Sequence, residues 1–517
     1  MGVGRTRGVA LLGLEGHLVD VEVHIAATLP GFVIVGLPDT SLNESRDRVK
    51  AALANTGFNI NAKHVTVNLS PATLPKAGSG FDLAIAVAVL SALGVVDSAA
   101  AARCVHLGEL GLDGRVRPVR GVLPSVLAAA RGEEPQIVVP AGNEAEARLV
   151  PGVGVVAVGS LAEVVERYGG CVPQDPPVEP VAQAPLPVLG GRGEPRPEPD
   201  LVDVLGQNEA RQALEVAAAG GHHLLFLGAP GAGKTMLAAR LPGLLPDLEE
   251  DEAVEVTAVH SVAGTFDPSG GLLRRPPFED PHHTASAASI VGGGSGMPRP
   301  GAASRAHRGV LFLDEAPEFN TRVLESLRQP LEHGELVIAR ASGTARYPAR
   351  FQLVLAANPC PCGNAVGKGI ACSCSSLVRR RYLSRLSGPL LDRVDLRVEV
   401  LPVTRAEMAA STTPEPTSVV ARRVAEARAV QRARLAGTGW RSNAEVPGRE
   451  LRSRWRLPRA ATAELEFAMD RGSLTARGYD RVLRVAWTLA DLEGAASPTA
   501  DHVGLAFGLR TTSGLAA

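Results

Sequence analysis

One short segment constrains this chain more than any other. Residues 228–235 read Gly-Ala-Pro-Gly-Ala-Gly-Lys-Thr, a complete P-loop, with the apolar run LLFL before it and a helical stretch after it. The glycines of such a loop let backbone amides curl around a phosphate, and the start of the following helix adds positive potential. Only five of the 53 cationic residues are lysines, so a chance match that ends in Lys-Thr is rare. The sequence therefore predicts a site for ATP (or GTP), formed by Gly228, Pro230, Gly231, Ala232, Gly233, Lys234 and Thr235.

Two later strand ends carry the side chains that a hydrolytic site needs. The apolar run GVLFL is followed by Asp314 and Glu315, which is typical of a Walker B motif. There Asp314, with the hydroxyl of Thr235, would hold Mg²⁺, and Glu315 would polarise the attacking water. The run FQLVLAA, expected as the next strand, ends in Asn358, whose amide would orient that water. An acidic turn and an Asn-Pro turn are the ordinary alternatives, and the P-loop upstream argues against both.

Composition divides the chain into three parts joined by a linker. Residues 171–200 hold nine prolines in 30 positions, which predicts a stiff linker. Residues 1–170 alternate Val/Ile-rich runs with helical patterns and predict a mixed α/β domain. In 201–403 apolar strands alternate with helices, which predicts a parallel sheet. Residues 404–517 are helical in pattern, and 401–517 hold 17 arginines against 12 acidic residues, a net charge of +5.

Hydropathy and charge exclude several classes of protein. The N-terminus lacks the long apolar core of a signal peptide, and the longest apolar stretch, 84–96, is too short to span a membrane and suits a buried helix. We therefore expect a cytoplasmic protein that has no membrane partner. The overall net charge of −1 excludes a protein that coats nucleic acid through uniform positive charge, so any such surface is local.

Four of the six cysteines, Cys360, Cys362, Cys372 and Cys374, form the pattern C-x-C-x9-C-x-C within 360–374. This clustering points to a metal site rather than to the disulfides of a secreted protein. Four thiolates in one loop are the ligand set of a structural, tetrahedral Zn²⁺ site. Because C-x-C is tighter than the usual C-x2-C, four reduced cysteines without metal are the alternative.

Several segments resemble one family along nearly the whole chain. DVLGQNEARQALEVAAAGGHHLLFLGAPGAGKT, PHHTASAASIVGGG, GVLFLDEAPEF, AANPCPCG and SGPLLDRVDL resemble the magnesium-chelatase-like branch of AAA+ ATPases. GFVIVGLPD, ESRDRVKAAL and VTVNLSPATLPKAGSGFDLAIA near the N-terminus, with LTARGYDRVLRVAWTLADLEG near the C-terminus, are similar to the YifB/ComM family. The segment GAASRAHRG departs from that family's pattern at Ala302 and Arg305.

The resemblance implies a fold and an assembly. It implies an N-terminal α/β domain like that of Lon proteases (ribosomal S5 domain 2-like), a central AAA+ P-loop domain and a C-terminal helical lid of the magnesium-chelatase type. It also implies a homo-hexameric ring with ATP between subunits, in which Arg393 resembles the arginine finger and Arg477 resembles sensor 2. The alternatives are a surface ion pair of Arg393 with Asp392 or Asp395, and a solvated arginine face around Arg477.

The Lon-like segment also suggests a serine protease, and two basic segments suggest DNA contacts. A protease would use Ser79 with a lysine base, but no lysine lies between Ser79 and Lys234, and Lys76 lies only three residues upstream. We therefore expect no protease activity. The basic segments place four arginines at near-helical spacing around Trp455 (Arg449, Arg452, Arg456 and Arg459) and three beside Tyr382 (Arg379, Arg380 and Arg381). Pro458 is expected to break the first helix before Arg459, and the alternative for that segment is a surface helix whose Trp455 packs inward.

Three functions fit these features. The first is a hexameric motor that uses ATP hydrolysis to move along single-stranded or branched DNA, the branch-migration helicase of natural transformation that the YifB/ComM resemblance implies. The second is a magnesium-chelatase-type ATPase that remodels a protein partner. The third is a regulatory ATPase without a DNA substrate. The Lon-like domain and the CPC pair favour the first, because chelatase motor subunits normally have neither.

Overall fold

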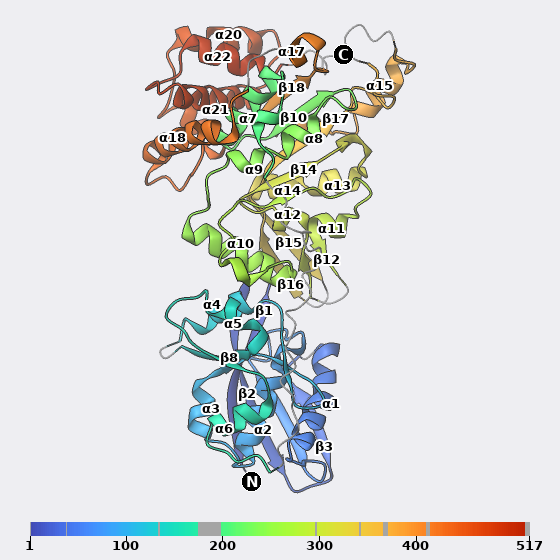
Figure 1. Ribbon diagram of the computed structural model, residues 1–517, viewed down its shortest axis with the longest axis vertical. Coiled ribbons are helices and arrows are strands. Elements are labelled where there is room, and N and C mark those ends of the chain that lie inside the picture. Colours follow the sequence, from blue (N-terminus) through green and yellow to red (C-terminus); the bar gives the residue numbers. More distant parts are fainter. Residues whose placement is uncertain are drawn as a thin grey trace.

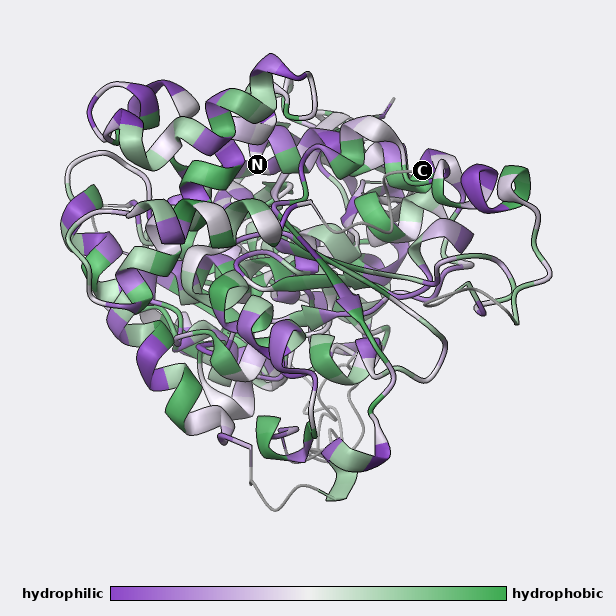
Figure 2. Cartoon of the chain, turned by 90° about the horizontal axis from the view of Figure 1, so that it is seen from above, coloured by the Kyte–Doolittle hydropathy of each residue, from purple (hydrophilic) through white to green (hydrophobic). Residues whose placement is uncertain are grey.

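The computed structural model describes residues 2–37, 39–132, 135–173, 198–294, 297–340, 343–365, 371–409 and 414–511. Most of the predicted proline-rich linker, 174–197, lies outside the described residues. The molecule is elongated, with an N-terminal α/β part at one end and a helical C-terminal part at the other (Figure 1). Helices show alternating hydrophilic and hydrophobic positions, as expected where one face of each helix is buried (Figure 2).

The N-terminal part contains a seven-stranded mixed sheet in the order β3-β4-β2-β1-β5-β8-β9. Its long central strands β1 and β2 pair antiparallel, whereas β5, β8 and β9 run parallel to one another. The strands are β1 (Val3–Leu12), β2 (Glu15–Ala26), β3 (Gly31–Val35), β4 (His64–Ser70), β5 (Val105–His106), β8 (Gln136–Pro140) and β9 (Gly154–Val158), with a small pair β6 (Glu109–Leu110) and β7 (Val116–Arg117). The helices are α1 (Thr40–Asn55), α2 (Asp82–Ala92), α3 (Ser98–Arg103), α4 (Val122–Ala129), α5 (Glu144–Ala147) and α6 (Leu161–Arg167). The apolar stretch that is too short for a membrane forms α2, whose residues from Asp82 to Ser91 are all buried.

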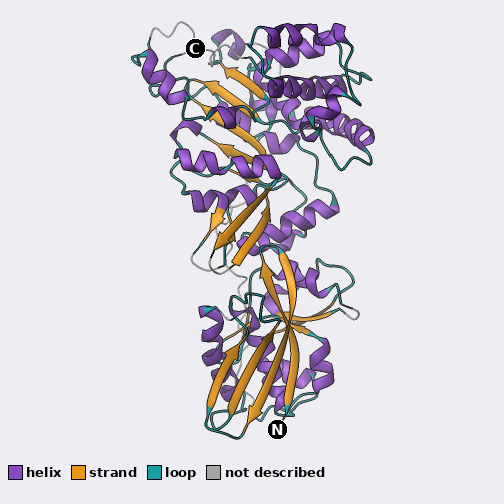
Figure 3. Ribbon diagram, turned by 180° about the vertical axis from the view of Figure 1, so that it is seen from behind, coloured by secondary structure: helices purple, strands orange, loops and turns teal. Residues whose placement is uncertain are grey.

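The central part is built on a five-stranded sheet in the order β11-β14-β17-β10-β18, and every neighbouring pair is parallel. Its strands are β10 (Leu224–Gly228), β11 (Phe278–Glu279), β14 (Val310–Leu313), β17 (Gln352–Ala357) and β18 (Leu396–Val400), beside a short pair β12 (Gly292–Gly293) and β13 (Arg299–Pro300). Its helices are α7 (Asn208–Gly220), α8 (Lys234–Ala238), α9 (Leu241–Leu244), α10 (Glu250–Ala263), α11 (Ala287–Val291), α12 (Ala302–Arg305), α13 (Thr321–Ser326), α14 (Arg328–His333), α15 (Ser376–Leu383) and α16 (Gly388–Leu391). The predicted parallel α/β architecture is confirmed, and Figure 3 shows the strands layered between helices.

A hairpin of β15 (Glu335–Arg340) and β16 (Gly343–Pro348) interrupts the predicted strand order. The FQLVLAA strand, β17, is therefore the neighbour of β14 in the sheet but not the next strand along the chain. The N-terminal part packs against this hairpin and α10. A Cβ on Gly13, at the tip of the β1–β2 hairpin, would lie 2.3 Å from the carbonyl oxygen of Arg346, and Ser261 Oγ of α10 donates to Glu146 Oε1 at 2.5 Å.

The C-terminal part is helical, as predicted, with α17 (Arg405–Ala409), α18 (Thr417–Leu435), α19 (Gly448–Arg452), α20 (Arg459–Asp470), α21 (Ala476–Leu492) and α22 (Ala500–Gly508). In α21 an apolar stripe that includes Val482, Val485 and Leu489 is buried. The arginines around Trp455 do not share one helix, because α19 already ends at Arg452. Pro458 separates them from α20, which begins at Arg459, as predicted, and Trp455 is partly buried against the core. None of the helices in the described ranges is long and apolar enough to cross a membrane.

Candidate nucleotide-binding site

The P-loop connects the end of β10 to the start of α8 and takes the shape that its glycines permit. Gly231 and Gly233 have positive φ angles of 76° and 96°, a region that residues with a Cβ rarely adopt. A Cβ on Gly228 would lie 2.3 Å from the carbonyl oxygen of Val400 on β18, so only glycine fits where the loop leaves the sheet. The loop thus begins at a close contact between two strands and ends in a helix N-terminus.

Lys234 lies folded against this loop and reaches the next strand. Its ammonium donates to the carbonyl oxygens of Gly228 at 2.7 Å and Ala229 at 2.8 Å, and to Asn358 Oδ1 at 2.9 Å. Burial lowers the pKa of Lys234, while the negative charges of Asp314 and Glu315 raise it. Two residues that the sequence assigned to one site, Lys234 and Asn358, are therefore in direct contact.

The two acidic residues after β14 lie beside the P-loop in different environments. Thr235 Oγ1 donates to Asp314 Oδ2 at 2.6 Å, so the two predicted Mg²⁺ ligands are adjacent. Glu315 has a left-handed backbone with φ 49°, and its amide donates to Asp314 Oδ1 at 2.8 Å. This left-handed conformation is sparsely populated for residues other than glycine, and the Glu315 side chain is half exposed.

Two side chains at this site were not identified from the sequence. His283 Nδ1 lies 3.4 Å from Glu315 Oε2, and its ring lies against that of His282, with the centroids 4.1 Å apart. Gln207 donates from Nε2 to the carbonyl oxygen of Ala232 in the P-loop at 3.2 Å. His283 lies in PHHT and Gln207 in LGQN, two of the segments that resemble the family. Neither segment shows by itself that this residue faces the P-loop.

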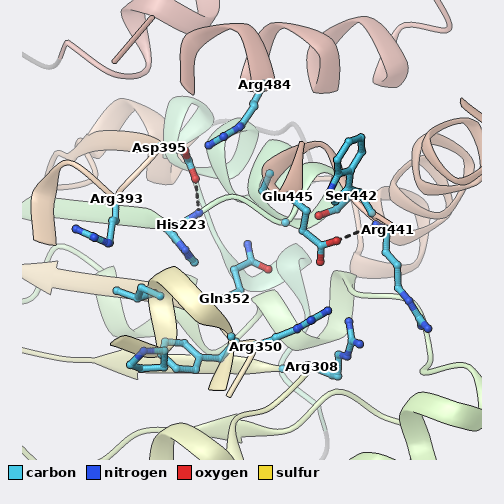
Figure 4. A pocket seen from close by; sticks show the side chains of 18 of the residues that line it. His223, Arg308, Arg350, Gln352, Arg393, Asp395, Arg441, Ser442, Glu445 and Arg484 are labelled. Carbon is cyan, nitrogen blue, oxygen red and sulfur yellow. Dashed lines mark hydrogen bonds between the residues drawn. The ribbon is translucent and has the colours of Figure 1, made fainter. Parts of the chain in front are cut away.

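The opposite, amino edge of the same sheet forms a separate pocket of about 820 Å³ between the central and C-terminal parts. His223, Gly309, Gln352 and Asp395, which stand at the start of β10, β14, β17 and β18, line it. Eight arginines also line it: Arg308, Arg350, Arg393, Arg428, Arg441, Arg477, Arg481 and Arg484. Figure 4 shows five of these arginines (Arg308, Arg350, Arg393, Arg441 and Arg484) around the pocket, on different elements.

Arg393 and Arg477 thus lie across the sheet from the P-loop of their own chain. Arg393 donates to the carbonyl oxygen of Pro389 at 2.6 Å and pairs with Glu332 rather than with Asp392 or Asp395. Burial lowers its pKa, and the neighbouring Arg328, Arg481 and Arg477 lower it further. The structure does not bring these two arginines together with Lys234, Asp314 and Asn358.

Asp395 is the buried anion at the centre of the arginine pocket. Its Oδ1 accepts from Arg481 Nη1 at 2.5 Å, and its Oδ2 accepts from the amide of His223 at 3.0 Å. Burial alone raises the pKa of Asp395, but Arg481 and the imidazole of His222 more than offset it, so the pKa lies well below the ordinary value. Burial lowers the pKa of His223 to about 4. Asp395, at the start of β18, therefore joins Arg481 of α21 to the start of β10.

The four clustered cysteines meet directly after Asn358. Their sulfur atoms all lie within 4.8 Å of one another, and Cys360 Sγ is 3.3 Å from Cys362 Sγ and 3.7 Å from Cys372 Sγ. Four thiolates at 2.3 Å around a tetrahedral Zn²⁺ would be about 3.8 Å apart, which these spacings approach. All six cysteines of the chain are free, so the cluster is not a pair of disulfides.

Ser79 and Lys76, the two residues considered for a protease site, bond to other groups and not to each other. Lys76 is buried, and its ammonium donates to the carbonyl oxygens of Leu69 at 3.1 Å and of Pro71. Ser79 Oγ donates to the carboxylate of Glu109. Ser79 thus faces an acidic side chain, and Lys76 holds a turn of the backbone.

Comparison with known proteins identifies the family. Models of the magnesium chelatase subunit ChlI match residues 200–408 and 21–143, and a model of the ChlI C-terminal region matches 414–510. The chain is 40% identical over 502 residues to the competence protein ComM of Haemophilus influenzae, covering 97% of this chain and 96% of ComM. It is 39% identical to the protein YifB of Escherichia coli, covering 96% and 94% of the two chains. The chain belongs to the YifB/ComM family.

Other relatives place this family among the magnesium-chelatase-like AAA+ ATPases. An uncharacterized protein of Mycobacterium tuberculosis is 52% identical over 99% of both chains. The magnesium-chelatase 38 kDa subunit of Rhodobacter capsulatus is 29% identical over 58% of this chain and 83% of that subunit. The YifB/ComM relatives thus match nearly the full length, whereas the chelatase subunit matches a smaller share of the chain.

Replacing Asp395 with Asn should remove about 3–5 kcal/mol of stability from the C-terminal part, because Arg481 then keeps a partly buried, unpaired charge. The depressed pKa means that this stabilisation is present above the pKa of an unfolded aspartate, about 3.9, and is lost as the pH falls through the lowered folded value. All three tryptophans lie in 404–517, so tryptophan fluorescence during urea unfolding at pH 7 reports on this part. Asp392→Asn, three residues away, is the control, and equal stability of the two variants would contradict the assignment.

Proposed function

We propose that this protein is an ATP-hydrolysing ring motor that moves DNA strands, a branch-migration helicase of recombination or natural transformation. The observation that carries the ATPase half is the contact of Lys234 with Asn358 beside the Thr235–Asp314 pair. These residues fit ATP and Mg²⁺, because they combine a glycine loop, a buried ammonium, a hydroxyl and carboxylates. Bound Mg²⁺–ATP would supply the γ-phosphoryl group that is transferred to water.

Each side chain then has a distinct task. The amides of 231–234 and the ammonium of Lys234 hold phosphate oxygens, and Thr235 with Asp314 holds the cation. Glu315 accepts the proton of the attacking water, and His283 beside it fixes the orientation of that carboxylate. Asn358, held by Lys234, orients the water from the neighbouring strand. These roles, with the left-handed backbone at Glu315, make a site that can polarise water next to a phosphate.

A ring places the arginine pocket of one subunit against the P-loop of the next. Because Arg393 and Arg477 lie at the opposite sheet edge from their own P-loop, a role at a phosphate requires a neighbouring subunit. Arginine suits that role because it stays charged and donates two parallel hydrogen bonds to phosphate oxygens. We therefore propose a homo-hexamer in which Arg393 acts as the finger and Arg477 as sensor 2.

The DNA substrate is supported by the family and by charge. A relative of nearly equal length is named a competence protein, and the net charge of +5 in 401–517 offers a local basic surface. We propose that 1–170 assembles or guides the ring, that 201–403 hydrolyses ATP, and that 404–517 is the lid. The linker 171–200 would join the first two, and the cytoplasm, where DNA and ATP meet, is the proposed compartment.

Glu315→Gln should retain ATP binding and lose hydrolysis by about a hundredfold or more, since the amide no longer accepts a proton. Nucleotide binding is measured with a fluorescent ATP analogue and turnover by phosphate release. Glu318→Gln, three residues on and paired with Arg385, is the matched control. Wild-type turnover in the Glu315 variant would show that another residue activates the water.

The motor predicts that branched and single-stranded DNA raise the ATPase rate and that ATP drives three-strand exchange. Both are measured on purified protein, with Glu315→Gln as the variant that should bind DNA without exchanging strands. Inertness toward every form of DNA would overturn the helicase and favour the chelatase-type alternative, an ATPase that remodels a protein partner or regulates one.

We also propose that the four clustered cysteines hold a structural Zn²⁺. Their sulfur spacing approaches that of a tetrahedral site, and with four protein thiolates no coordination position is left for catalysis. Such a site would fix the loop that follows Asn358.

Protein purified without chelator should contain about one Zn²⁺ per chain, measured by elemental analysis. Cys372→Ser should lower that content and the melting temperature of the central part. Cys171→Ser, at an exposed free cysteine outside the cluster, should change neither. Absence of stoichiometric zinc in the wild type would contradict this proposal.

A further inference from the structure

Helix α15 carries an unusual run of exposed charge. Arg379, Arg380 and Arg381 follow one another and are all exposed. Among the residues that the structure describes, no carboxylate lies within ion-pair distance of any of the three. Successive helix positions are about 100° apart, so the three guanidinium groups spread over more than half of the helix circumference. Three like charges this close repel one another unless an external anion neutralises them.

The second basic segment differs in this respect. Arg449 pairs with Glu450 at 3.4 Å, Arg459 pairs with Glu466 at 3.2 Å, and Arg452 pairs with Asp480. Three of its five arginines are therefore neutralised within the chain, whereas Arg454 and Arg456 are exposed and have no ion pair among the described residues. Trp455 packs edge-on against Trp440. Of the two basic segments noted in the sequence, α15 is the one in which every arginine lacks an ion pair among the described residues.

The cysteine cluster fixes the base of α15. Cys374 is followed directly by Ser375, whose hydroxyl accepts from the amide of Val378 at 3.3 Å and caps the helix. At the other end Tyr382 is buried. Between these anchors α15 projects from the upper edge of the molecule, far from the N-terminal part, in both ribbon views (Figures 1 and 3).

Two routes connect α15 to the nucleotide-binding site. In the cysteine loop, a Cβ on Gly363 would lie 2.5 Å from two ring carbons of Pro230, so the loop packs directly on the P-loop. After the helix, Arg385 Nη1 donates to the carbonyl oxygen of Pro317 at 3.2 Å and pairs with Glu318 at 3.2 Å. These two residues follow closely after Glu315.

Tyr382 strengthens the second route. Burial raises the pKa of its hydroxyl, and the nearby carboxylates of Glu318 and Glu315 raise it further, so the hydroxyl stays protonated and can donate toward Glu318. A displacement of α15 would thus act on the P-loop through Gly363 and on the Glu315 segment through Tyr382 and Arg385.

We propose that α15 contacts the phosphate backbone of the DNA and transmits that contact to the nucleotide-binding site through the cysteine loop and Tyr382. This inference rests on the proposed function, because it requires a nucleic-acid substrate. Unpaired arginines at spread angles suit a polyphosphate, which offers charge along its whole length, better than a second subunit, which would need carboxylates at matching positions.

The test compares two triple variants of the full-length protein that remove equal charge. Arg379→Gln/Arg380→Gln/Arg381→Gln changes α15, and Arg449→Gln/Arg452→Gln/Arg459→Gln changes the three paired arginines of the other basic segment. Affinity for labelled single-stranded and branched DNA is measured by fluorescence anisotropy over a range of salt concentrations. The α15 variant should bind at least about tenfold more weakly, and the slope of log affinity against log salt should fall by about two to three. The control should keep a slope within about one of the wild type.

Transmission is tested by Tyr382→Phe, which keeps the buried ring and removes the hydroxyl. Affinity for DNA should stay within about twofold of the wild type, while the stimulation of ATPase by DNA falls several-fold. Tyr347→Phe, which also loses a buried hydroxyl that donates to the carbonyl oxygen of Pro298, should keep full stimulation. Unchanged stimulation in Tyr382→Phe would overturn the transmission route.

The outcomes separate this inference from the proposed function. A wild type that binds no DNA overturns both. A wild type that binds DNA, with an α15 variant of the same affinity and salt slope, overturns the role of α15 alone. Loss of the assembled ring in the α15 variant, seen by sedimentation, would show that α15 contacts a neighbouring subunit and would also overturn it. If the triple variant does not fold, Arg380→Glu replaces it with the same expected direction.

Discussion

The parallel pairing of β10 with β17 on one side and β18 on the other determines where the chemistry of this protein lies. Parallel strands all end at one edge of a sheet and begin at the other, so the two edges have different chemistry. The carboxyl edge collects the P-loop, Asp314 and Asn358, which follow three neighbouring strands. The amino edge collects His223 and Asp395 and, with them, the arginine pocket.

The residues at the carboxyl edge of the sheet could be predicted from the sequence, because each is marked by a short motif. The P-loop spacing, the carboxylates after β14 and the amide after β17 each follow an apolar run, and parallel strands bring such ends together. The roles of these residues stay predictions, although their contacts agree with them. The approach of His283 to Glu315 could not be predicted, because it depends on how the loop after β11 crosses the sheet edge.

The errors of the sequence analysis have physical causes of the same kind. In the hairpin β15–β16 the first strand has a short apolar run, LVIA, the second alternates polar and apolar residues, and Ala-Ser-Gly lies between them; this is a weaker signal than the buried strands on either side. The arginines around Trp455 have helical spacing, but periodicity does not show that α19 stops at Arg452. The sequence offered Asp392 and Asp395, which lie close to Arg393 in the chain, as its alternative partners. The actual partner of Arg393 is Glu332 on α14. Side chains reach partners that only the fold brings near.

The difference between the two sheet edges also limits how copies of this chain can assemble. An interface that brings the arginine pocket of one copy to the P-loop of another joins two unlike surfaces, so it is heterologous. An open assembly built through such an interface always has one free arginine pocket and one free P-loop. Its growth ends only when the rotation between neighbours closes a ring. The C-terminal helical part is attached to the amino edge by buried bonds, including His222 Nε2 to Thr488 Oγ1 at 2.7 Å and Arg481 to Asp395. In the proposed ring, a change at one subunit's phosphates that moves Arg477 of its neighbour would therefore move that neighbour's C-terminal helical part and sheet together.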